Sequence, residues 1–295
     1  TGTTNIETLT NGFATVEYVT MRDNEIYFTD KGISITANAP SDSGSATVAN
    51  ITLNGNELEG SSVGIHTFKQ GSGYSELKNL TITGNKLAIN NPTASAYAVG
   101  LADVEGYSEF GNNEITLSGT LSGAYDGVDI SGGATENWTI SGNELDGSNV
   151  GTSSSGFRLR NSLPSGVVLN LSGNRITGWT KGFYSDTLAT GTTVELRRNW
   201  IYDNTSYGIE NGSGATIDAI LNYWGAKSGP KHSSNTGGLG DDVSDNVDFN
   251  PWHQDADFIS ISEGTVLNIN QEKYYKTIQA AVNEANPGDT IQVGA

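Results

Sequence analysis

Four charged residues of opposite sign stand close together in the middle of this chain: Asp126, Asp129, Arg158 and Arg160. Carboxylate and guanidinium groups are the kind that polar binding and catalytic sites use, since they exchange protons or hold charged ligands. The same four groups can instead form ion pairs between neighbouring strands, which are worth a few tenths of a kcal/mol at a surface. Both interpretations require the two segments to lie side by side in the fold.

A second set of carboxylates is the run Asp241, Asp242, Asp245 and Asp248. Carboxylate oxygens are the ligands that calcium prefers, so calcium is the one cofactor that the sequence leaves open. The run lacks the spacing of an EF-hand loop, and a solvated acidic loop explains it equally well. The three histidines are far apart and show no ligand spacing; they are His66, His232 and His253.

Aromatic residues offer another kind of chemistry, because an exposed ring can stack on a sugar. Six of them fall in or near predicted loops and outward positions: Tyr97, Tyr107, Tyr125, Trp179, Tyr184 and Tyr202. Rings at such positions also cap the turns of repeat proteins. A carbohydrate platform and a purely structural role therefore both remain open.

The elements that must position these residues come from a short pattern that occurs eight times. Each copy has an apolar residue three places before an asparagine and another two places after it. The asparagines are Asn24, Asn56, Asn85, Asn113, Asn143, Asn174, Asn199 and Asn222, spaced by 23–32 residues. A repeat of this length predicts a solenoid, a propeller or an array.

A glycine followed by an apolar residue recurs between successive asparagines, so each period holds at least two short alternating segments. Such alternation predicts half-buried strands, and nothing inside the repeats has a helical period. We therefore expect an all-β fold, a parallel β-solenoid of about eight coils. Stacked coils place the asparagines about 4.8 Å apart, which predicts a ladder of amide hydrogen bonds with no chemical role. We expect each asparagine to sit at a sharp turn, in the left-handed conformation that it tolerates.

The same stacking predicts a column of outward side chains, one residue past each glycine–apolar pair. Its members are Ser34, His66, Ala102, Asp129, Arg158, Tyr184 and Glu210. In this column Asp129 and Arg158 are neighbours on adjacent coils, with Asp126 and Arg160 nearby.

Composition limits the partners. The chain of 295 residues has a net charge of −18 and no cysteine. This charge argues against nucleic acid and anionic membranes as partners. No run of 18 apolar residues exists, so we expect no membrane insertion, and Thr1 begins no signal peptide. An acidic surface suits an extracellular or cell-surface location.

The last part of the repeats resembles a known family. It contains Asn222-Tyr223-Trp224-Gly225, Ser228-Gly229-Pro230 and Pro251-Trp252. This combination is similar to the closing segment of bacterial and archaeal right-handed parallel β-helix repeat proteins of the pectin-lyase-like superfamily. The resemblance implies a right-handed β-helix over residues 1–252. Because polysaccharide lyases of this superfamily use an arginine or lysine base with acidic calcium ligands, it also implies an acidic-sugar site at Asp126, Asp129, Arg158 and Arg160.

Residues 253–273 are predicted to be a linker, and residues 274–295 a helix followed by a strand. Tyr275, Ile278, Ala281, Val282 and Ala285 fall on one helical face, and Ile291 lies in the strand. This segment resembles the opening of such a β-helix, where a helix covers the open N-terminal end, although here it stands at the other end. Tyr275, Ile278, Val282 and Ile291 are therefore candidate assembly residues, which would cover the chain's own first coil, another subunit or a neighbouring module.

Three functions follow as hypotheses. The first is a non-catalytic structural module of a surface layer, filament or adhesin, whose copies associate head to tail. The second is a polysaccharide lyase, epimerase or hydrolase that acts on acidic polysaccharide. The third is a carbohydrate-binding module.

Overall fold

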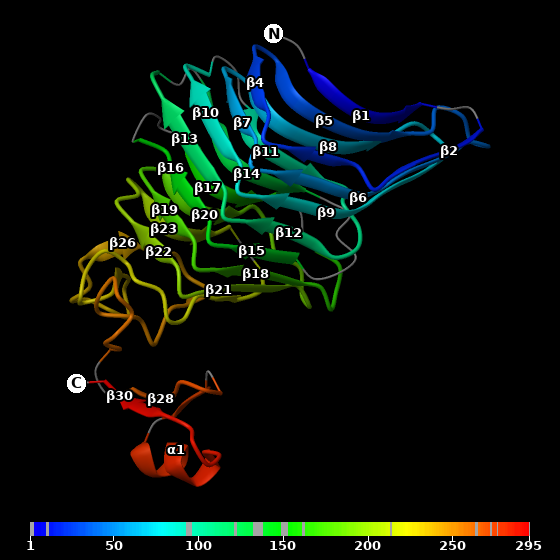
Figure 1. The fold of residues 1–295 in the computed structure, drawn as a ribbon. Helices are drawn as coiled ribbons and strands as arrows, with labels where there is room; N and C mark the ends of the chain where they lie inside the picture. The colour runs from blue at the N-terminus through cyan, green and yellow to red at the C-terminus, as the bar shows by residue number, and fades with distance from the viewer. Residues whose placement is uncertain are drawn as a thin grey trace.

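The computed structural model describes residues 3–9, 12–92, 96–120, 123–131, 138–148, 153–160, 163–212, 214–262, 265–271, 273–275 and 277–294. It is a parallel β-solenoid of about eight coils, with one short helix in the described part of the chain (Figure 1). The predicted fold class is thereby confirmed.

Three parallel sheets, A, B and C, run along the stack, and each coil contributes a strand to most of them. Sheet A consists of β1 (Thr4–Leu9), β5 (Lys31–Asn38), β8 (Val63–Gln70), β11 (Ala96–Ala102), β14 (Tyr125–Ser131), β17 (Ser154–Leu159), β20 (Lys181–Ser185) and β23 (Tyr207–Asn211). Sheet B consists of β2 (Phe13–Glu17), β3 (Thr20–Arg22), β6 (Ser45–Asn54), β9 (Tyr74–Thr83), β12 (Ser108–Gly111), β15 (Trp138–Ser141), β18 (Val168–Ser172), β21 (Thr193–Arg197), β24 (Ile217–Asp218) and β27 (Val247–Asp248). Sheet C consists of β4 (Glu25–Phe28), β7 (Glu57–Gly60), β10 (Lys86–Asn90), β13 (Glu114–Ser118), β16 (Glu144–Asp146), β19 (Arg175–Thr177) and β22 (Trp200–Tyr202).

The repeated apolar residues fill one continuous core inside the three sheets. The residues three places before the ladder asparagines, such as Leu53, Ile140 and Leu171, are fully or almost fully buried. They stack on one another because the register keeps them in phase, as in the pairing of Ile140 with Leu171. Only Met21, in the first coil, is half-buried, because no coil lies beyond it among the described residues.

The eight asparagines form a ladder through the stack. In each step the Nδ2 of one asparagine donates to the Oδ1 of the next at 2.7–3.0 Å. The same Oδ1 also accepts the backbone N–H of the preceding asparagine, as Asn174 does from Asn143 at 3.0 Å. Each Nδ2 beyond the first coil donates in addition to a carbonyl of the coil before it, such as Ile140 O for Asn174. Asn56 to Asn222 are buried, so the ladder satisfies polar groups that have no access to water.

The turn at each ladder step is made by a different residue from the one expected. The residue directly before the asparagine has the positive φ: it is Gly55, Gly84, Gly142 or Gly173 in four coils, and Asp23, Asn112, Arg198 or Leu221 in the others. None of the eight ladder asparagines has a positive φ. The expectation that these asparagines adopt the left-handed conformation was therefore wrong; their role is hydrogen bonding, and the preceding residue bends the chain.

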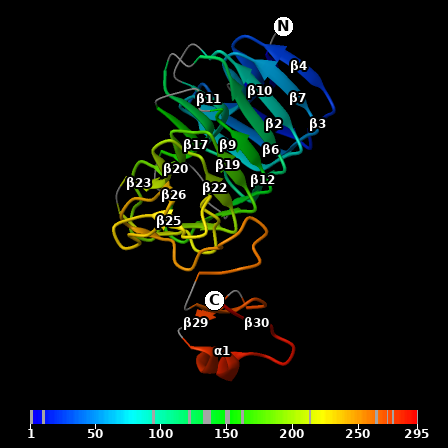
Figure 2. The ribbon, with the colours of Figure 1, turned by 90° about the vertical axis from the view of Figure 1, so that its left-hand side faces the viewer.

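The stack ends in a closing segment and a small C-terminal unit. The closing segment contains β25 (Pro230–Lys231) and β26 (Gly240–Asp242), and β27 continues sheet B. Beyond it, β28 (Val266–Asn268) pairs antiparallel with β29 (Lys273–Tyr275) and β30 (Ile291–Val293), and α1 (Ile278–Glu284) packs on these strands. Part of the predicted linker is therefore a strand. Figures 1 and 2 show this unit beyond the closing end of the stack, opposite the N-terminus.

Candidate functional site

The charged residues singled out from the sequence lie on the outer face of sheet A. Asp129 on β14 pairs in register with Arg158 on β17, which pairs with Tyr184 on β20. The column is Asn5, Ser34, His66, Gly100, Asp129, Arg158, Tyr184 and Glu210. The assignment of Ala102 to this column was wrong: Val99, not Leu101, aligns with Ile65 and Val128, so Gly100 is the outward residue.

Gly100 leaves room for the ring of Tyr97. A Cβ at Gly100 would lie 2.2 Å from this ring, so a larger residue would displace it. The Tyr97 ring is in turn 5.8 Å from the ring of His66, which stacks on Phe68 at 4.7 Å. Burial and the charge of Lys31 lower the pKa of His66 to about 4, so this ring is neutral at pH 7. A strip of aromatic rings therefore leads along sheet A toward the charged residues.

Both arginines are held by carboxylates. Arg158 Nη2 lies 3.0 Å from Asp186 Oδ1, and Arg158 Nη1 lies 3.5 Å from Asp126 Oδ2. Arg160 Nη2 lies 3.2 Å from Asp126 Oδ2, and its Nε donates to Asp129. The structure thus brings all four predicted residues together and adds Asp186. The sequence carried a signal for Asp186, because it stands two residues beyond Tyr184 as Arg160 stands two residues beyond Arg158.

The electrostatics of this cluster favour the ion-pair interpretation. Burial raises the pKa of Asp126 to about 6 and also raises that of Asp129, although both arginines oppose the rise. Three carboxylates face two guanidinium groups, so the five side chains carry no excess positive charge for an acidic sugar. Either arginine would have to leave its carboxylate partners before it could act as a base.

The four acidic residues of the closing segment have separate partners. Asp241 Oδ2 accepts the Nδ2 of Asn204 at 2.8 Å, and Asp242 pairs with Lys231 at 3.0 Å. Asp245 lies 3.3 Å from His232, and Asp248 is part of β27. No group of three or more histidine, cysteine or acidic residues suited to a metal ion occurs in the ranges that the structure describes. Calcium binding by this run stays a prediction.

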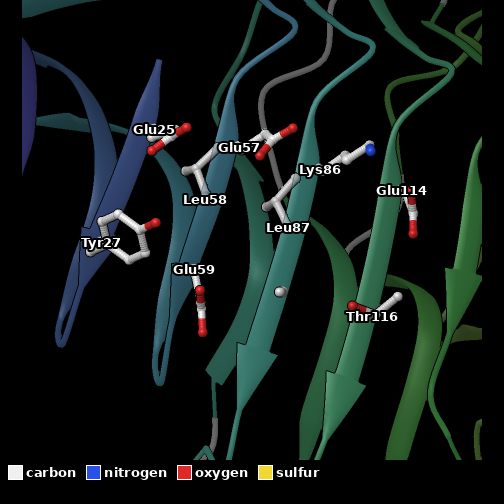
Figure 3. Close-up of a pocket in the computed structure, with 10 residues that line it drawn as sticks. Glu25, Tyr27, Glu57, Leu58, Glu59, Lys86, Leu87, Glu114 and Thr116 are labelled. Atoms are coloured by element: carbon white, nitrogen blue, oxygen red, sulfur yellow. The ribbon is translucent and has the colours of Figure 1, made fainter. Parts of the chain in front are cut away.

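Sheet C carries a groove that sequence reasoning missed. Figure 3 shows Glu25, Glu57, Lys86 and Glu114 side by side on neighbouring strands, and the groove between them has a volume of about 210 Å³. Register places Glu57 between Glu25 and Lys86. Directly opposed carboxylates repel one another, so Glu25 and Glu57 destabilise this edge slightly. The sequence carried a signal for this groove, because a charged residue stands directly after each of four successive asparagines: Glu25, Glu57, Lys86 and Glu114.

The aromatic residues divide into two groups. Tyr125 and Trp179 are fully buried, and each donates to a backbone oxygen, of Ser62 and Leu145 respectively. These two belong to the core, so they cannot form a sugar platform, whereas Tyr97, Tyr184 and Tyr202 are half-buried. Tyr107, in contrast, is 56% exposed.

The candidate assembly residues lie in the C-terminal unit. Ile278 and Val282 on α1 are 53% and 52% exposed, whereas Ala281 between them is buried. Tyr275 belongs to β29 rather than to the helix, and Ile291 on β30 packs against the buried cluster of the unit. Ile278 and Val282 are one helical turn apart, so they form an apolar patch that nothing in the described chain covers.

No family model, curated protein or solved structure matches this chain. No helix in the described residues has the length and apolar character needed to cross a bilayer.

Proposed function

We propose that this chain is a non-catalytic structural module of the pectin-lyase-like type, at the cell surface, whose copies associate head to tail. A surface layer, a filament and an adhesin are the assemblies that such a module suits. The observation that carries the proposal is the difference between the two ends of the stack. The first end is an open set of strand edges, and the other carries a helix–strand unit with exposed apolar residues.

The open end, here called the head, consists of the edge strands β1, β2, β3 and β4. Each of them pairs with a later strand on one side only. Phe13 on β2 is 88% exposed, although phenylalanine gains most from burial. In the described chain Asn24 Oδ1 accepts no hydrogen bond, while every later ladder Oδ1 accepts two. Unpaired edges of this kind recruit further strands unless something covers them.

The other end, here called the tail, is the unit of β28, β29, β30 and α1. It is fixed to its own stack by a small buried cluster, in which Ile261 and Leu267 pack with Ile220 and Leu221. Helix α1 lies on the side of the unit that faces away from the stack (Figures 1 and 2). Ile278 and Val282, each about half exposed on this helix, are therefore available for contact, and we propose that they bind the head of a second copy.

A contact between two different surfaces is heterologous, and it gives open chains when the rotation between copies does not close a ring. Terminal repeats of a solenoid are normally altered so that they cover the core, and the described residues of the head, 3–9 and 12–28, contain no such alteration. The resemblance of α1 and β30 to the opening of a β-helix supports the same pairing, because that element covers an open first coil.

Charge should make the association depend on salt. The chain carries −18, so two copies repel each other at long range. Salt shortens the range of this repulsion, and the apolar contact at Phe13, Ile278 and Val282 is not weakened by it. Association should therefore strengthen as the salt concentration rises from about 0.05 M to about 0.5 M, over which the screening length falls from roughly 14 Å to roughly 4 Å.

The test is sedimentation velocity over a concentration series. The wild-type chain should form dimers and longer species whose proportion rises with concentration and with salt. Phe13→Lys should abolish them through the head, and Ile278→Lys with Val282→Lys should abolish them through the tail. All three side chains are more than half exposed, so these variants should fold. Leu239→Lys is the matched control, because Leu239 is 83% exposed but lies in the closing segment, outside both the head and the tail. A wild-type chain that remains monomeric at every concentration and salt would overturn the proposal.

A further inference from the structure

The outer face of sheet B has a hollow of about 520 Å³ close to the head. Two exposed tyrosines border it: Tyr18 is 78% exposed and Tyr107 is 56% exposed. The hollow crosses β6 and β9, which are neighbours in Figure 1. Its remaining lining consists of neutral polar side chains, namely Thr20, Thr52, Thr81, Asn50 and Asn79. No charged residue lines it, although the chain carries −18.

The fold requires a left-handed backbone at Tyr18, but it does not explain why a tyrosine occupies this position. Its φ is +59°, in the left-handed region, where a bulky side chain costs roughly 1–2 kcal/mol. In the next two coils the same position is filled by Asn50 and Asn79, which tolerate φ values of +54° and +57°. Because the ring of Tyr18 is largely exposed, its burial does not offset the free energy of this backbone strain. A strained residue that does not stabilise the fold indicates a functional role, such as ligand binding.

Tyr107 lies at the far end of the column that begins with Tyr18. Glu17 pairs with Ala49 and Ala49 with Lys78, so Tyr18, Asn50 and Asn79 follow one another along the axis. Lys78 pairs with Glu105, so Gly106, with a φ of +72°, takes the next place, and Tyr107 directly follows it as an extra residue of that coil. Three steps of about 4.8 Å separate the two rings by roughly 14 Å.

The floor between the tyrosines offers hydrogen bonds without charge. Thr20, Thr52 and Thr81 are register partners on successive coils, so their hydroxyl groups repeat along the axis. Asn79 Nδ2 donates to Asn50 Oδ1 at 2.9 Å, which fixes the two amides side by side. Within the described chain the Nδ2 of Asn50 makes no hydrogen bond, so its donors remain available.

We propose that this Tyr18–Tyr107 groove binds a neutral oligosaccharide that runs along the solenoid axis. Sugar rings present an apolar face that stacks on an aromatic ring, and hydroxyl groups that exchange hydrogen bonds with threonines and amides. The absence of charge from the lining selects against acidic sugars, which also meet repulsion from the net charge of the chain. This proposal does not depend on head-to-tail association, since all the lining residues belong to one chain.

Isothermal titration calorimetry and a glycan array test the proposal, with protein made in a host that does not glycosylate, because Asn50 and Asn79 each begin an Asn-x-Thr sequence. The probes are hexamers of glucose, xylose, mannose and N-acetylglucosamine, with a galacturonate hexamer as the acidic comparison. At least one neutral hexamer should bind. Tyr18→Ala and Tyr107→Ala should each weaken its binding by roughly two- to twelve-fold, the loss of one stacking contact.

Two further variants make the result decisive. Tyr27→Ala is the matched control, since Tyr27 is also 56% exposed but lies on sheet C, and it should leave binding unchanged. Tyr18→Asn should weaken binding while it raises the melting temperature, because asparagine relieves the left-handed strain. Binding by none of the neutral hexamers would overturn the proposal, as would preference for galacturonate or an equal loss in Tyr27→Ala.

Discussion

Replacement of Asn174 by alanine tests the ladder where its effect should be largest. Asn174 Oδ1 accepts the backbone N–H and the Nδ2 of Asn143, and its Nδ2 donates to Ile140 O and to Asn199 Oδ1. Alanine leaves the N–H of Asn143 with no acceptor in the described chain. The other groups keep a partner: Asn143 Nδ2 still donates to Phe110 O, and Asn199 Oδ1 still accepts the N–H of residue 174.

One orphaned buried N–H costs about 1–3 kcal/mol, and the loss of the other three hydrogen bonds costs about 1 kcal/mol in total, because Asn143 Nδ2 and Asn199 Oδ1 each keep another partner. Asn174→Ala should therefore lower the free energy of unfolding by about 2–4 kcal/mol. Asn24→Ala is the matched control at the end of the ladder. Asn24 is exposed, and Asn56 Oδ1 would still accept the N–H of residue 24, so this change should cost less than about 1 kcal/mol.

Urea unfolding at a protein concentration low enough to keep the chain monomeric gives both values. The slopes of the two variants should agree with that of the wild type, so that the shift in midpoint reports stability. Equal losses in Asn174→Ala and Asn24→Ala, or no loss in either, would refute the account of the ladder as a set of buried, mutually satisfied amides.

Other predictions concern the core, the turns, the acidic groups and the sheet A cluster. Leu171→Ala, at a fully buried position, should cost roughly 2–5 kcal/mol in the same urea experiment. Gly142→Ala should cost more than Gly173→Ala: both glycines have positive φ, but only at Gly142 would the new Cβ meet a close neighbour, Asn112 Oδ1 at 2.5 Å. Burial raises the pKa of Asp241 to about 7, so the free energy of unfolding of the wild type should fall as pH rises from about 4 to 7. Asp241→Asn should remove this loss, and its free energy of unfolding at pH 8 should exceed that of the wild type by roughly 1–3 kcal/mol. Incubation with pectin, alginate or a glycosaminoglycan should give no unsaturated uronate absorbance, and a product that disappears in Arg158→Ala would instead support the lyase hypothesis.

The stacking of coils could be predicted from the sequence because each coil repeats the same pattern of asparagine and apolar residues. The spacing of the asparagines and their apolar neighbours implied stacked coils, and the structure has a parallel β-solenoid with about eight of them. The short C-terminal helix and strand were also expected, although the helix begins only at Ile278, after Thr277 caps it. These features depend on the spacing of polar and apolar residues within one segment, which can be recognised in the sequence alone.

The features that could not be predicted depend on the register between strands of neighbouring coils. The strand that contains Gly100 is shifted by two residues from the simple glycine–apolar rule, because Ala98 takes the place of the glycine and Tyr97 covers Gly100. Tyr18 and Tyr107 are 89 positions apart and belong to different segments of the repeat pattern. Only the stacking of coils shows that both line one hollow, so the groove between them could not be recognised beforehand.

Binding between the head of one copy and the tail of another can be tested by mixing two variants, each damaged at one end. Phe13→Lys has a damaged head and an intact tail, while the Ile278→Lys, Val282→Lys double variant has an intact head and a damaged tail. Each alone should sediment as a monomer. When the two are mixed in equal amounts, one intact tail can bind one intact head, and the account predicts a one-to-one dimer with no longer species. A mixture that stays monomeric, when the wild-type chain associates, would contradict the pairing of these two ends.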